Sequence, residues 1–60
     1  GLAKEMMRPE WGLMKEPAFY RDRQLVQVKL AAPPADDDPV WLAVQQEFLR
    51  RTGFYLQKAN

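Results

Sequence analysis

The chain contains no cysteine, no histidine and no serine. Without cysteine and histidine it has neither a disulfide framework nor the ligands of a Cys/His zinc site. The same absences exclude a thiol nucleophile, a histidine general base and a Ser-His-Asp triad. The three glycines, Gly1, Gly12 and Gly53, are too widely spaced to form a phosphate-binding loop. We therefore expect a protein that is not an independent enzyme and that carries no metal and no cofactor.

The chain also lacks a long apolar run and an excess of charge of one sign. No stretch approaches the roughly 20 apolar residues of a membrane-spanning helix, and no segment has the pattern of a signal peptide. Nine Lys and Arg residues stand against eight Asp and Glu residues, a net charge of +1. We expect no association with membranes, and the absence of cysteine is compatible with a cytoplasmic location.

The length of 60 residues limits the chain to a single small module. A domain of this size buries only about 60% of the surface of its unfolded chain, and no disulfide is available to stabilise it. The chain starts with Gly1 rather than with methionine. We therefore expect residues 1–60 to be a fragment or domain of a larger protein, or else to form a homo-oligomer, with residues 1–9 and 58–60 frayed.

The strongest element is a helix over residues 39–52. Asp38 is a good N-cap, Pro39 suits the first helical position, and Gly53 suits the residue that follows the helix. The acidic run 36–38 is explained by this capping and by its place at the positive end of the helix dipole. Apolar side chains gather on one face of the helix: Val40, Trp41, Leu42, Val44, Phe48 and Leu49.

Residues 19–30 predict the clearest strand. Val26, Val28 and Leu30 alternate with polar neighbours, which is typical of a strand with one buried face. The connection 31–38 contains a Pro-Pro pair, which excludes both helix and sheet ladder. Residues 54–57 predict a second short strand after the helix. A strand, a crossover helix and a strand form a βαβ unit with parallel strands and a right-handed crossover.

The N-terminal part is less regular. Residues 2–7 predict a short helical lead-in, and residues 10–15 predict a strand around Trp11 that pairs antiparallel with the 19–30 strand. The predicted fold class is therefore α+β: a small single domain with a βαβ C-terminal half, a two- or three-stranded sheet, and one main helix on one face.

The odd positions of the 19–30 strand predict a binding surface on the sheet face opposite the helix. A sheet face with cations and aromatic rings binds single-stranded nucleic acid by phosphate contacts and base stacking. We therefore predict a noncatalytic accessory binding module of a larger intracellular protein, which contacts nucleic acid through Phe19, Arg21, Arg23, Lys29 and Tyr55.

A second interpretation is a protein-protein assembly or interdomain docking module. Methionine-rich and aromatic surfaces adapt readily to protein partners. The partner would be another protein, the remainder of the parent chain or a second copy, and the contact residues would be Trp11, Met14, Phe19 and Leu25. A third interpretation is that the sheet face is simply exposed to solvent.

Overall fold

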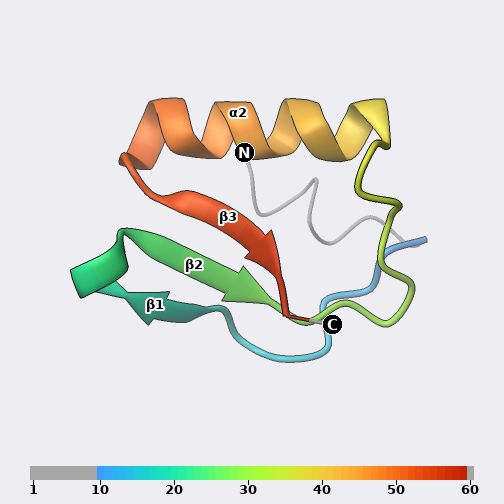
Figure 1. Ribbon diagram of the computed structural model, residues 1–60. Coiled ribbons are helices and arrows are strands. Elements are labelled where there is room, and N and C mark those ends of the chain that lie inside the picture. Colours follow the sequence, from blue (N-terminus) through green and yellow to red (C-terminus); the bar gives the residue numbers. More distant parts are fainter. Residues whose placement is uncertain (1–9, 60) are drawn as a thin grey trace.

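The computed structural model describes residues 10–59, so the lead-in expected over residues 2–7 lies outside the described residues. The described elements, in chain order, are β1 (Ala18–Tyr20), the 3-10 helix η1 (Arg21–Arg23), β2 (Leu25–Val28), α2 (Pro39–Thr52) and β3 (Tyr55–Lys58). They form a three-stranded mixed sheet with one helix on one side, so the predicted small α+β fold is confirmed (Figure 1).

The sheet has the strand order β1-β2-β3. β1 pairs antiparallel with β2, and β3 pairs parallel with β2. The segment from β2 through α2 to β3 is therefore the predicted βαβ unit. β3 lies nearest to α2, and β1 lies farthest from it (Figure 1).

The prediction of one strand over residues 19–30 is wrong, because the chain reverses direction at η1. The N–H of Gln24 donates to the carbonyl of Arg21 at 3.2 Å, and Gln24 adopts a left-handed conformation with φ 49°. A polar run without glycine or proline thus makes the turn. The hairpin places Phe19 opposite Val26, which changes the face of the sheet that Phe19 occupies.

The helix α2 has the predicted boundaries and the predicted caps. The Asp38 carboxylate accepts hydrogen bonds from the N–H groups of Val40 at 2.8 Å and Trp41 at 3.3 Å. Gly53 ends the helix in a left-handed conformation with φ 77°, and its N–H donates to the carbonyl of Leu49 at 2.8 Å. A residue without a side chain accepts this conformation at no steric cost.

The segment around residues 10–15 pairs antiparallel with the chain beyond β2, as an isolated bridge rather than as a full strand. The bridge joins Leu13 and Leu30, and the N–H of Ala31 donates to the carbonyl of Gly12 at 2.7 Å. A Cβ atom on Gly12 would lie 3.2 Å from the Cβ of Ala31. The glycine therefore allows the close approach of the two backbones.

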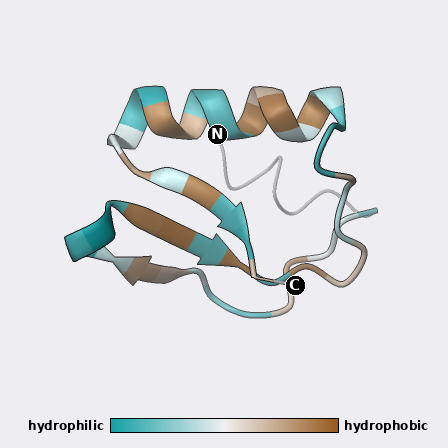
Figure 2. Cartoon of the chain, in the orientation of Figure 1, coloured by the Kyte–Doolittle hydropathy of each residue, from teal (hydrophilic) through white to brown (hydrophobic). Residues whose placement is uncertain are grey.

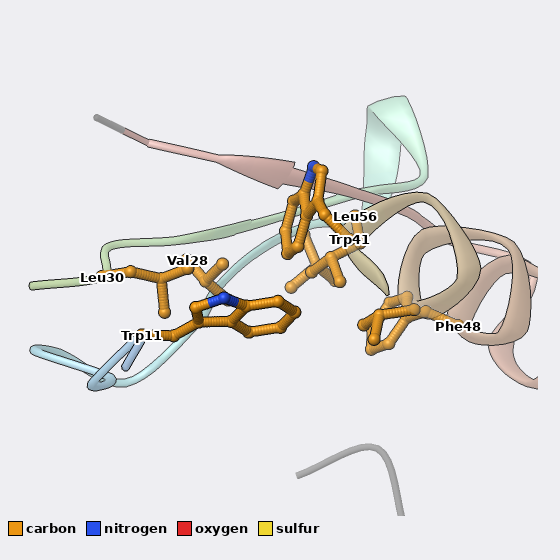
Figure 3. Close-up of a cluster of buried hydrophobic side chains, with 8 residues drawn as sticks. Trp11, Val28, Leu30, Trp41, Phe48 and Leu56 are labelled. Atoms are coloured by element: carbon orange, nitrogen blue, oxygen red, sulfur yellow. The ribbon is translucent and has the colours of Figure 1, made fainter. Parts of the chain in front are cut away.

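The core lies between α2 and the sheet. Trp41 of α2 meets Trp11 edge to face, with ring centroids 5.7 Å apart and planes at 81°. Figure 2 shows the hydrophobic residues of β2 and the alternation of hydrophobic and hydrophilic positions along α2. The buried cluster in Figure 3 consists of Trp11, Val26, Val28, Leu30, Trp41, Val44, Phe48 and Leu56.

The C-terminal strand β3 begins and ends one residue later than the predicted 54–57 strand. Lys58 is part of β3, and the N–H of Ala59 donates to the carbonyl of Val28 at 2.7 Å. Lys58 also donates to the carbonyl of Pro34 and forms an ion pair with Asp36, Nζ to Oδ1 2.8 Å. These contacts order two residues that the sequence places in a frayed end.

Candidate functional site

The candidate site lies on the side of the sheet that faces away from α2. Val26 and Leu56 point into the core, so the residues next to them along each strand point to the opposite side. We call this side the open face. Its side chains are those of Ala18, Tyr20, Leu25, Gln27, Tyr55 and Gln57.

One row of the open face carries two aromatic rings with a leucine between them. Leu25 lies opposite Tyr20 on β1 and beside Tyr55 on β3. Neighbouring strands are about 4.8 Å apart, so the two tyrosines are separated by roughly 10 Å across the sheet. Tyr55 is 56% exposed, while Tyr20 and Leu25 are half-buried. The row is a largely apolar platform that crosses all three strands.

The turn η1 places a cation at the edge of this platform. The guanidinium carbon of Arg23 lies 4.3 Å from the ring centroid of Tyr20. A cation over an aromatic face is worth about 0.5–1 kcal/mol at an exposed site. Arg23 also lies 3.9 Å from the Asp22 carboxylate. Both groups of this ion pair are exposed, which leaves the Arg23 guanidinium accessible to a ligand.

The next row of the open face is polar. Gln27 of β2 lies beside Gln57 of β3 and opposite the small side chain of Ala18. The burial of Val28 and Leu30 shows that the alternation continues past the end of β2. The exposed Lys29 therefore lies on the same side as Gln27.

The structure separates the residues that the sequence predicts to share one face. Phe19 is opposite Val26, so it lies on the helix side of the sheet, where it is 67% exposed beyond the cover of α2. The predicted grouping of Phe19 with Tyr55 is therefore wrong. Arg21 and Arg23 belong to η1 and lie at the end of the sheet rather than along a strand.

The residues of the protein-docking interpretation are also dispersed. Trp11 is 5% exposed and belongs to the core, whereas Met14 is 57% exposed. Leu25 is at the centre of the open face. Tyr20 is a residue of the open face that the sequence does not predict, because a continuous strand would point it towards the helix. The polar run from Arg21 to Gln24 between two apolar segments is the signal that could have revealed the turn.

A polar hollow of about 260 Å³ borders the open face at the outer edge of β3, and its lining includes Gln57 together with Asp36, Trp41, Gln45 and Lys58. The hydrogen bond from Lys58 and the charge of its ammonium group lower the pKa of the Asp36 carboxyl. Among residues 10–59, no group of three or more acidic side chains is arranged to hold a metal ion. The hollow is thus lined by the Asp36 carboxylate, which is paired with Lys58, and by the amides of Gln45 and Gln57.

Comparison with known proteins found no family model, no curated protein and no solved structure that matches this chain. In the part of the chain that the structure describes, no helix combines the length and the apolar character needed to cross a bilayer.

Proposed function

We propose that the chain is a noncatalytic accessory module of a larger cytoplasmic protein and that it binds single-stranded nucleic acid through the open face. The observation that carries this proposal is the row of Tyr20, Leu25 and Tyr55 across the three strands, with Arg23 held over Tyr20. Aromatic rings on a sheet face stack with bases of any sequence, and each stacked base contributes about 1–3 kcal/mol.

The platform offers two kinds of stacking surface. Tyr55 has an exposed ring that can take a base directly. Tyr20 is already covered on one side by Arg23, and a guanidinium plane is itself a surface on which bases stack. A single-stranded nucleic acid that crosses the sheet from β3 to β1 would thus contact the Tyr55 ring, then the apolar Leu25, and then the Arg23–Tyr20 pair.

The distribution of charge around the open face favours a polyanionic ligand. Arg21 and Arg23 lie at one end of the face, and the exposed Lys29 lies towards its other end. The acidic run 36–38 precedes α2 at the end of the sheet opposite η1 (Figure 1). This acidic run therefore stands away from the tyrosine platform. Asp22 lies beside Arg23 at the edge of the platform, so η1 carries two arginines and one carboxylate, and the net charge of the whole chain is +1.

The test is the salt dependence of binding to a short single strand, measured by fluorescence anisotropy. If Arg21, Arg23 and Lys29 contact phosphates, a plot of the logarithm of the association constant against the logarithm of the salt concentration should have a slope of about −2. The double variant Arg21→Ala and Arg23→Ala should reduce the magnitude of this slope by about 1.4. The double variant Arg50→Ala and Arg51→Ala removes the same charge from α2 and should leave the slope unchanged.

Absence of binding at low salt would contradict the proposal. An equal loss in the α2 control variant would also contradict it, because the effect would then come from net charge rather than from the open face.

A protein-docking function is a second candidate, and one observation favours it. Phe19 is 67% exposed on an edge strand beside the buried Val26, so an apolar surface continues outward from the core. Sedimentation of the chain separates the two functions. Dimerisation that Phe19→Ser abolishes would favour docking of a second copy, whereas a monomer that binds oligonucleotides would favour the first proposal.

A further inference from the structure

The second row of the open face contains two side-chain amides that the proposed stacking does not use. The parallel register places Gln27 and Gln57 directly beside each other on neighbouring strands. They follow Leu25 and Tyr55 by two residues, a distance of about 7 Å along the sheet. Both amides therefore lie within reach of the edge of a base that is stacked on Tyr55.

Both amides are available for a ligand. Neither Gln27 nor Gln57 makes a side-chain hydrogen bond to any residue of the described part of the chain. Gln45 differs, because its Nε2 donates to the carbonyl of Leu56 at 2.8 Å and holds α2 against β3. Gln57 also borders the polar hollow at the outer edge of β3. Gln57 is exposed, so its amide is accessible to a ligand on the open face.

We infer that Gln27 and Gln57 read the edge of the stacked base and favour adenine; this inference rests on the proposed function. A glutamine amide presents one acceptor and one donor side by side, which match the 6-amino group and N7 of adenine. Adenine presents an acceptor next to its 6-amino group on its Watson–Crick edge as well. Two neighbouring amides can therefore engage an adenine in more than one orientation on the Tyr55 ring.

The inference makes Gln27 and Gln57 specificity determinants rather than sources of affinity. Stacking and phosphate contacts act on every base, so they set the affinity for any single strand. Hydrogen bonds to a base edge act only where the edge fits. Substitution of the two amides should therefore change the preference among bases and leave the salt dependence as it is.

The experiment compares hexamers of adenine, cytosine and thymine nucleotides with a hexamer of unsubstituted purine nucleotides, which has the adenine ring system without the 6-amino group. Deoxyribose and ribose versions are measured by fluorescence anisotropy. The adenine hexamer should bind about five- to tenfold more tightly than the purine hexamer, the lower part of the range for one bidentate amide contact.

The double variant Gln27→Met and Gln57→Met retains the approximate side-chain length and removes both amides. It should equalise the affinities for the adenine and purine hexamers and leave the affinity for thymine nucleotides unchanged. Gln46→Met is the matched control, because Gln46 is exposed on α2. This control should retain the adenine preference, and far-UV circular dichroism should show that all variants are folded.

The possible outcomes separate the inference from the proposed function. Binding of all hexamers with equal affinity, or an adenine preference that survives the double Gln→Met variant, would overturn the inference and leave the proposed function standing. Failure of the unmodified chain to bind any hexamer at low salt would overturn both.

Discussion

The two sides of the sheet are built from alternate residues of the same strands, yet they differ in how deeply their side chains are buried. On the helix side, Val26 and Val28 are each 1% exposed, and Leu56 is 2% exposed beneath α2. On the open face, the neighbouring Tyr55 is 56% exposed, and Gln57 is exposed as well. One side therefore carries the burial that stabilises the fold, and the other carries groups that a ligand can reach. Substitutions on the two sides should separate stability from binding.

Two aromatic residues on opposite sides of the sheet should differ most in the stability that is lost on substitution by alanine. Trp41→Ala should abolish the folded state, because truncating a buried aromatic residue costs about 3–5 kcal/mol, as much as the whole stability of a domain this small. Tyr55→Ala should cost about 1 kcal/mol or less, the scale of a cross-strand pair. Thermal unfolding followed by circular dichroism measures both variants. Equal destabilisation would mean that the open face is part of the core.

The second comparison concerns the two turns that lead into the parallel strands. Gly53, before β3, and Gln24, before β2, both adopt left-handed conformations, with φ 77° and φ 49°. An added Cβ at Gly53 meets no atom within 4 Å, so Gly53→Ala tests conformation alone. It should lower the free energy of unfolding by about 1–2 kcal/mol.

Gln24→Gly is the matched reverse substitution. It removes the steric cost of a side chain in the left-handed region and adds the backbone entropy of glycine, so a gain of up to about 1 kcal/mol is expected. Urea unfolding of both variants gives the comparison. A stabilised Gly53→Ala variant would contradict the left-handed cap of α2, and a strongly destabilised Gln24→Gly variant would contradict the turn at η1.

The contrast between these two turns also explains how much of the fold could be predicted from the sequence. α2 was predictable to the residue, because Asp38, Pro39 and Gly53 are the residue types that its ends require. The turn at η1 was not, because Gln24 occupies a conformation that more commonly belongs to glycine or asparagine. Its stability comes from the hairpin that it closes, and local propensity does not report such tertiary support.

The turn at η1, which the sequence does not predict, also changes which residues form the candidate site. Side chains alternate between the two faces of a strand, so a shift of one residue in the pairing moves each side chain to the other face. The turn therefore moved Phe19 to the helix side and brought Tyr20 to the open face, beside Leu25. Tyr55 follows the correctly predicted helix, and its expected place opposite the core is confirmed by its exposure and by the register of β3.

The ion pair of Lys58 with Asp36 lies at the rim of the sheet, beside the outer edge of β3, and should contribute least to stability. The Lys58 side chain is 12% exposed, and its Nζ lies 5.9 Å from the centroid of the Trp41 ring. Lys58 is paired with Asp36, whose side chain is 97% exposed. Lys58 lowers the pKa of the Asp36 carboxyl below its ordinary value of 3.8. The ion pair therefore contributes stability above that value, and the contribution is lost as the pH falls through the lowered pKa of the folded state.

Asp36→Asn should accordingly lower the Tm slightly at about pH 6, and the difference from the unmodified chain should shrink as the pH falls below 3.8. Comparing the two proteins at each pH cancels other acid effects, such as protonation of Glu47, whose pKa is lowered by hydrogen bonds from Arg50 and Arg51. Asp37→Asn removes the same charge without an ion pair in the described structure and should leave the Tm nearly unchanged at about pH 6. A Tm difference for Asp36→Asn that persists undiminished in acid would exclude the ion pair as its cause. The rim would then contribute as little to stability as the exposed residues of the open face.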